Sequence, residues 1–222
     1  MKSGIASRRG APERIDPEHR FVLHGISWET YERLLHEIDD GAIRLTYDRG
    51  ALEIMSPSRH HEKLKKLIAR MIEIFTLELG IAIASGGSTT FRQALLERGL
   101  EPDECYWIAS EPRMRHKDDY DPESDPPPDL VVEVEISRSA LDRLGIYAAL
   151  GVPEVWRWND ERLVPHRLGK SGAYSPARKS RALPFLAFAE VERFLARRLE
   201  LDENSLIRSF RDWVRENLLD RS

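Results

Sequence analysis

Three acidic side chains lie in one apolar segment of the chain, PPPDLVVEVEIS at residues 126–137. Its β-branched residues predict a buried strand. Because strand side chains alternate between two faces, Asp129, Glu133 and Glu135 share one face and the apolar even-numbered residues share the other. Neighbouring carboxylates repel, and a divalent cation would relieve that repulsion. The alternative is a solvent-exposed face of an antiparallel strand, which this strand taken alone favours.

A further acid begins the preceding predicted strand, where Pro102-Asp103 opens residues 104–109. An acid at the start of one strand and two acids on its neighbour can converge on one point. Carboxylate oxygens suit Mg²⁺ or Mn²⁺, and such ions assist phosphodiester hydrolysis by polarising the phosphoryl oxygen and lowering the pKa of bound water. We therefore predict Asp103 and Glu133 as metal ligands, with Glu135 as a third ligand or a general base.

The first turn of the strongest predicted helix, residues 60–79, carries His60, His61 and Glu62. At 100° per residue both histidines fall toward the apolar stripe, whereas Glu62 points away from it. A buried polar side chain is unusual unless it is hydrogen-bonded. Taken in isolation, the two histidines are better explained by local capping or by a satisfied core histidine than by a functional role, and Glu62 is explained by the helix dipole.

These residues are positioned by an alternation of helices and strands. We expect helices at 27–38, 60–79, 139–150, 186–198 and 202–219, and strands at 42–47, 51–55, 81–84, 88–92, 104–109, 130–136, 154–158 and around 162–168. This order predicts an α/β (α+β) fold with a mixed central sheet flanked by helices. Residues 21–222 are expected to form one domain after a loose polar segment, residues 1–20.

Composition limits the other classes of protein. The net charge of −4 gives no overall basic field of the kind that a dedicated nucleic-acid binder carries. The single cysteine, Cys105, excludes an intramolecular disulfide and a cysteine-based zinc site. No apolar run approaches the roughly 20 residues of a membrane span, and no apolar segment follows the basic N-terminal residues as in a signal peptide. We expect a cytoplasmic protein with no membrane partner; a homodimer stays open.

Several segments together resemble the Uma family of restriction endonucleases, within the PD-(D/E)XK nuclease superfamily. The resemblance covers roughly residues 20–217 and is most specific from Pro126 to Trp158. It implies a restriction-endonuclease-like core with a mixed four-stranded sheet, Mg²⁺ or Mn²⁺ as the cofactor and DNA as the partner. The segments are MSPSRHHEK, GSTTFR, GLEPDECYWI, PPPDLVVEVEISRSALDRLGIYAALGVPEVWRW and LIRSFRDWVRE.

By this resemblance Pro102-Asp103 stands for the superfamily's PD, and Glu133 for its second acid. His61, with or without Glu62, stands for the polar residue of the first core helix. Asp129 is more typical of a residue at the entry to a strand than of a ligand.

The chain departs from the superfamily pattern at Glu135, where a lysine is expected. Glu135 can bind a metal or act as a base but supplies no positive charge. The missing cation would come from Arg143 or from Arg92. The leading hypothesis is a Mg²⁺-dependent DNA endonuclease with Asp103, Glu133, Glu135, His61 and Arg143 in its site. The alternatives are a catalytically degenerate module that binds nucleic acid or a protein, and a metal-stabilised structural protein.

Overall fold

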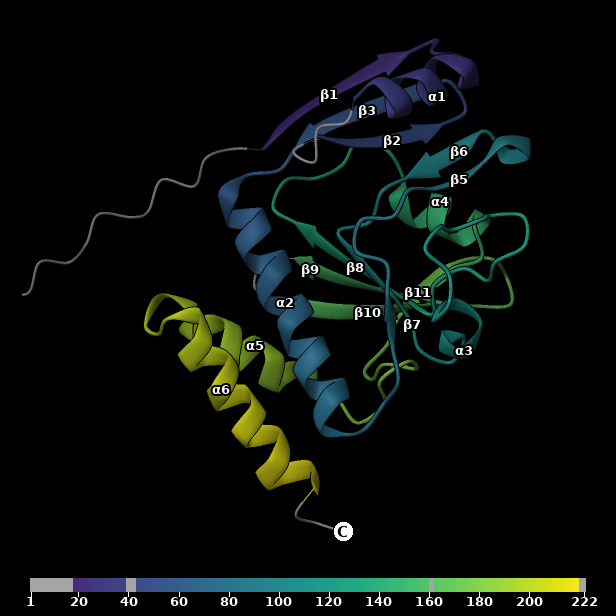
Figure 1. Ribbon diagram of the computed structural model, residues 1–222. Coiled ribbons are helices and arrows are strands. Elements are labelled where there is room, and N and C mark those ends of the chain that lie inside the picture. Colours follow the sequence, from purple (N-terminus) through teal and green to yellow (C-terminus); the bar gives the residue numbers. More distant parts are fainter. Residues whose placement is uncertain (1–17, 39–42, 160–161, 220–222) are drawn as a thin grey trace, which may run out of the picture.

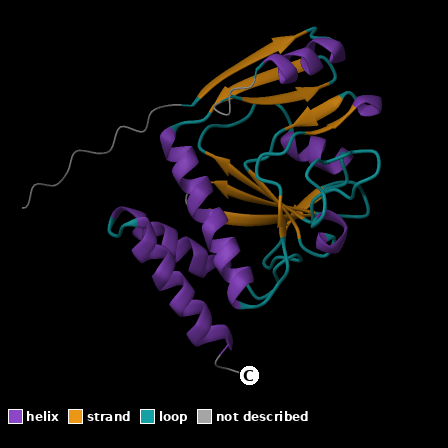
Figure 2. Ribbon diagram, in the orientation of Figure 1, coloured by secondary structure: helices purple, strands orange, loops and turns teal. Residues whose placement is uncertain are grey.

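Two β-sheets lie at an angle to one another in the computed structural model, with helices packed on their faces and one helix, α4 (Arg143–Ala149), between them (Figure 1). The structure describes residues 18–38, 43–159 and 162–219. Figure 2 shows the same view by secondary structure, with the strands gathered into two groups. Helices and strands therefore occur together in one mixed α+β arrangement.

The larger sheet has six strands in the order β11-β10-β9-β8-β7-β4. Strands β8 and β9 run parallel and are joined by the helix α4, whereas the other neighbours pair antiparallel. The β-branched run of β8 thus lies in the interior of this sheet, as its apolar composition favours. The elements are β4 (Ala84–Ser85), β7 (Glu104–Trp107), β8 (Leu130–Glu135), α4 (Arg143–Ala149), β9 (Glu154–Asn159), β10 (Arg162–Leu168) and β11 (Tyr174–Pro176).

The smaller sheet has five antiparallel strands in the order β1-β3-β2-β6-β5. One of its faces is covered by α1, whose Tyr31 stacks on Tyr47 of β2. The other face looks toward the larger sheet (Figure 1). The elements are β1 (His19–His24), α1 (Trp28–Glu37), β2 (Arg44–Asp48), β3 (Ala51–Ser56), β5 (Phe91–Gln93), the 3₁₀ turn η1 (Ala94–Leu96) and β6 (Arg98–Leu100).

The helix α2 (Arg59–Glu78) crosses one face of the larger sheet and is itself covered by the C-terminal helices (Figure 1). Its apolar stripe packs on Leu130, Val132 and Val134, the even-numbered residues of β8. The opposite face of β8 packs through Val131 against α4, β5 and β6. The remaining elements are α3 (Glu111–Met114), α5 (Phe188–Ala196), η2 (Arg197–Leu199), α6 (Glu203–Val214) and the π-turn η3 (Arg215–Leu219).

The mixed α+β class is confirmed, but several details of the prediction need correction. The larger sheet has six strands where four were implied, and a second sheet exists because β1 and β6 pair with the predicted hairpin β2-β3. The predicted boundary at residue 20 falls inside β1, which begins at His19; residues 1–17 lie outside the described residues. In the 81–84 and 139–150 segments only Ala84–Ser85 and Arg143–Ala149 form the regular element.

Candidate active site

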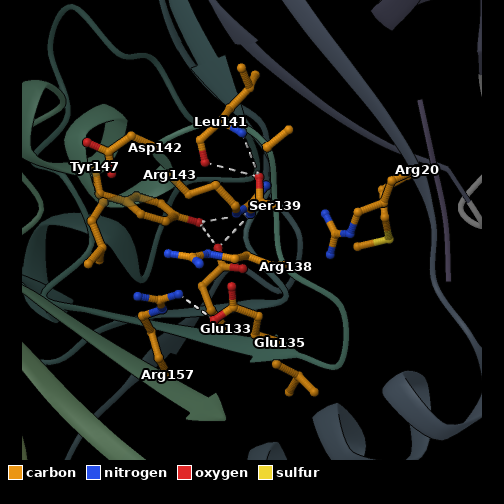
Figure 3. A pocket seen from close by; sticks show the side chains of 14 residues that line it. Arg20, Glu133, Glu135, Arg138, Ser139, Leu141, Asp142, Arg143, Tyr147 and Arg157 are labelled. Atoms are coloured by element: carbon orange, nitrogen blue, oxygen red, sulfur yellow. Dashed lines mark hydrogen bonds and ion pairs between the residues drawn. The ribbon is translucent and has the colours of Figure 1, made fainter. Parts of the chain in front are cut away.

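The acidic face of β8 is not solvent-exposed, contrary to the alternative drawn from that strand alone. Val131 on this face is fully buried beneath α4. Glu133 and Glu135 line a cavity of about 490 Å³ between the two sheets, and Figure 3 shows both side chains beside the arginines of the same cavity. Its arginines are Arg20, Arg138, Arg143 and Arg157. The cavity is therefore richer in positive charge than the chain as a whole.

Asp103 and His61 form a buried ion pair behind Glu133. The Nε2 atom of His61 lies 2.8 Å from Oδ1 of Asp103, and the other carboxylate oxygen accepts a 2.7 Å hydrogen bond from the N–H of Val134. Ser58, the N-cap of α2, fixes this turn by accepting from the N–H of His61. Burial acts to raise the pKa of Asp103, but the hydrogen bond and charge of His61 outweigh it and lower that pKa.

A second buried carboxylate, Glu18, lies on the other side of the same imidazole. Its Oε1 atom is 2.6 Å from Nδ1 of His61, and its Oε2 atom accepts hydrogen bonds from the N–H and hydroxyl of Ser137 just after β8. Burial acts to lower the pKa of His61, but hydrogen bonds to Asp103 and Glu18 outweigh it and raise the pKa to about 9. The imidazole is therefore a cation at neutral pH. No sequence motif indicated Glu18.

Glu133 is held by α4. Arg143 donates to its Oε1 atom at 2.6 Å, and the hydroxyl of Tyr147 donates to the same oxygen. Arg143 is itself fixed, because it also donates to Oγ1 of Thr46 at 2.5 Å and to the carbonyl of Glu101 at 2.8 Å. Burial raises the pKa of Glu133; the charge of Arg143 opposes this, and the negative charge of Asp103 adds to it. The negative charge of Asp103 thus disfavours the ionisation of Glu133.

Glu135 is paired with a different arginine, on the neighbouring parallel strand. Arg157 of β9 stands opposite Glu133 in the sheet register, and its guanidinium donates to Oε2 of Glu135. Figure 3 shows this pair at the floor of the cavity. The position at which the superfamily pattern has a lysine is therefore accompanied by a positive charge from the next strand.

The donor chemistry of these acids suits a hard divalent ion, although their present arrangement does not assemble one site. Burial raises the pKa of Glu133 and the charge of Asp103 adds to this, so an ion shared between the two carboxylates would favour the ionised form of Glu133. Within residues 18–38, 43–159 and 162–219, however, no three His, Cys, Asp or Glu side chains are grouped as a metal site. Glu135 would have to leave Arg157 to join the other two.

The structure separates the predicted residues into two groups. Asp103, Glu133, Glu135, His61 and Arg143 lie together at or just behind the cavity. Three other residues that the sequence suggested lie away from the cavity. Arg92 pairs with Glu32 at the surface, and Glu62 pairs with Lys65. Asp129 accepts hydrogen bonds from the N–H groups of Ile108 and Ser110 beyond β7.

Asp129 therefore has the structural role that was expected for it, and Cys105 is buried and free. Four residues that line or support the cavity could not be identified from the sequence, because no motif singles them out. They are Glu18, Arg20, Tyr147 and Arg157. Among the described helices none is long and apolar enough to cross a bilayer.

The protein has a restriction-endonuclease-like fold, with a mixed sheet flanked by helices. Two of its acids lie at neighbouring strands, Asp103 before β7 and Glu133 within β8. A family model described as "putative restriction endonuclease", Uma2, matches residues 28–204. The chain belongs to the Uma2 family, and that description points to a nuclease. No curated protein matches the chain.

Proposed function

We propose that the protein is a Mg²⁺- or Mn²⁺-dependent endonuclease that hydrolyses phosphodiester bonds of DNA. The observation that carries the proposal is the cavity on the acidic face of β8, where Glu133, Glu135 and Asp142 stand among four arginines. A phosphodiester is an anion, and arginine binds phosphate oxygens through paired N–H donors. Carboxylates at the floor of such a cavity are the groups that a divalent ion requires.

In this proposal Asp103 and Glu133 hold the ion, and Glu135 is a third ligand or the base that takes a proton from the attacking water. When bound, the ion polarises the phosphoryl oxygen and stabilises the leaving oxygen. His61 keeps Asp103 ionised and oriented, because its imidazolium contacts one carboxylate oxygen while the N–H of Val134 contacts the other. Arg143 takes the place of the absent lysine as the cation fixed beside Glu133.

A second candidate function is a non-catalytic module that binds nucleic acid or another anionic partner in the same cavity. The pairing of the carboxylates with His61, Arg143 and Arg157 favours it, because each carboxylate already has a cationic partner without a metal ion. Both candidates predict binding of an anion in the cavity, and only the first predicts cleavage.

Cleavage of plasmid and short duplex DNA in Mg²⁺ or Mn²⁺, with EDTA controls, tests the proposal. We expect metal-dependent cleavage that Asp103→Asn reduces by at least about a hundredfold, since this change removes a charge that acts on the ion. Asp202→Asn is the matched control, because Asp202 is an exposed N-cap of α6 and asparagine caps equally well.

Cleavage that survives EDTA or Asp103→Asn would contradict the proposal. DNA binding without cleavage in either metal, by a folded wild-type protein, would establish the second candidate instead. A protein that neither binds nor cleaves DNA would exclude the nuclease and would restrict the second candidate to a partner other than DNA.

A further inference from the structure

The two arginines that pair with the acids of β8 differ in how firmly they are held. Arg143 is bound by Thr46 and the carbonyl of Glu101 as well as by Glu133, and 15% of its side chain is exposed. Among the described residues, Arg157 donates its side-chain hydrogen bond to Glu135, and 30% of the Arg157 side chain is exposed. Partly exposed ion pairs are weak, whereas buried pairs are costly to break. The Glu135–Arg157 pair is therefore the exchangeable one.

We infer that Arg157 binds a phosphate group of the substrate and, by leaving Glu135, releases that carboxylate to join the metal ion. This inference rests on the proposed function and specifies how binding of the metal ion and binding of the DNA phosphate depend on each other. Without substrate, Arg157 neutralises Glu135 and competes with the ion for it. A phosphate in the cavity is a better partner for the guanidinium, because it offers paired acceptor oxygens.

Metal binding and phosphate binding are consequently cooperative. The metal ion takes Glu135 away from Arg157, and the phosphate takes Arg157 away from Glu135. Each ligand therefore raises the affinity of the protein for the other ligand by the same factor. The absence of a preassembled three-carboxylate group among the described residues agrees with this, since Glu135 is engaged by Arg157.

The neighbouring Arg138 provides a comparison within the same cavity. It lines the cavity and is exposed, and within the described part of the chain its guanidinium donates no hydrogen bond to a carboxylate. Replacing Arg138 by glutamine removes the same positive charge as replacing Arg157, but it releases no acid. Comparing the two variants therefore distinguishes the effect of losing a positive charge on metal affinity from the effect of releasing Glu135.

The experiment measures Mn²⁺ affinity by isothermal titration calorimetry in the absence of DNA. We expect Arg157→Gln to bind Mn²⁺ about tenfold more tightly than wild type, a factor typical of coupled sites, and Arg138→Gln to change the affinity less than about threefold. The double variant Glu135→Gln/Arg157→Gln should lose the gain, because the released ligand is then absent. Arg157→Lys, which keeps a charge but not the guanidinium geometry, should lie between wild type and Arg157→Gln.

A second measurement follows DNA directly. Anisotropy of a short labelled duplex in EDTA should show weaker binding to Arg157→Gln, opposite in sign to its gain in Mn²⁺ affinity. Circular dichroism confirms that each variant is folded, and Arg157→Lys provides the same comparison should the glutamine variant not fold.

Equal Mn²⁺ affinities for Arg157→Gln and Arg138→Gln, or a gain that survives in the double variant, would overturn the inference. Its failure differs from that of the proposed function. If the wild type cleaves DNA only with a metal ion but Arg157→Gln shows no gain in Mn²⁺ affinity, only the exchange of Arg157 between Glu135 and phosphate is refuted. A gain without any cleavage supports release of Glu135 to the metal and refutes the nuclease.

Discussion

His61 should make the stability of this protein depend on pH above neutrality. The imidazole is 1% exposed and lies between the carboxylates of Glu18 and Asp103, which raise its pKa to about 9. In the unfolded chain a histidine has a pKa of about 6.5. The folded protein therefore holds this proton more tightly, so protonation of His61 stabilises the folded state.

The magnitude follows from these two values. Each tenfold difference in proton affinity is worth about 1.4 kcal/mol, so values of about 9 and about 6.5 correspond to roughly 3 kcal/mol. This contribution is complete below pH ~6.5 and is lost as the pH rises through ~9. Glu18 and Asp103 keep their charges across this window, because the pKa of each carboxyl group is lowered in the folded protein.

Urea denaturation at pH ~6.5 and pH ~9.5 measures the loss. The free energy of unfolding of wild type should fall by roughly 3 kcal/mol more than that of His61→Gln. The comparison with the variant is needed because burial also raises the pKa of Cys105, which reduces stability above pH ~8.5 in both proteins. An equal fall in wild type and His61→Gln would refute the assignment of a charged imidazole between two carboxylates.

Two further predictions concern the contacts of Glu133. Glu133→Gln should lower the apo protein's free energy of unfolding by about 3 kcal/mol in urea denaturation, because Arg143 keeps a buried charge without its carboxylate; an unchanged or higher value would mean that repulsion between Glu133 and Asp103 dominates. Tyr147→Phe removes one hydrogen bond to Glu133 and should cost about 1 kcal/mol in the same assay, and a loss as large as that of Glu133→Gln would contradict the assignment of Arg143 as the main partner.

Much of the fold was predictable from local pattern. The helix α2 and the strand β8 have long, unmixed periodicities, and Ser27 and Ser58 cap their helices with side-chain oxygens that accept backbone N–H groups. The second sheet was not predictable, because it depends on which strands pair. Strands β2 and β6 pair although they lie about fifty residues apart in the sequence, as the partners Tyr47 and Gly99 show. No local sequence signal encodes that pairing.

The candidate site was predictable to a similar extent. Carboxylates at Asp103, Glu133 and Glu135 follow from residue type and strand position, and Arg143 was one of two candidates for the missing cation, but the individual pairings were not predictable. Sequence reasoning expected the three acids to repel one another, whereas Arg143 and Arg157 neutralise two of them. Arg157 reaches Glu135 only because β8 and β9 are parallel neighbours in one particular register.

Two buried carboxylates, Glu18 just before β1 and Asp103 just before β7, support the acidic strand. Val134 and Ser137 donate backbone N–H groups to Asp103 and Glu18, and the imidazole of His61 bridges those two carboxylates. The segment that carries Glu135 is thus fastened at both of its ends by one buried set of charges.

Glu53 of β3 continues this support beyond β8. Its carboxylate accepts from the N–H of Ala140 at 2.8 Å and from the hydroxyl of Ser139 at 2.9 Å, and it pairs with Arg20 of β1 at 2.8 Å. Arg20 in turn donates to the hydroxyl of Ser137. The loop from β8 to α4, which lines the cavity and leads into Arg143, is therefore held by charges that the smaller sheet provides. Because buried acids and arginines are costly unless paired, the position of this loop and the packing of the two sheets are determined together.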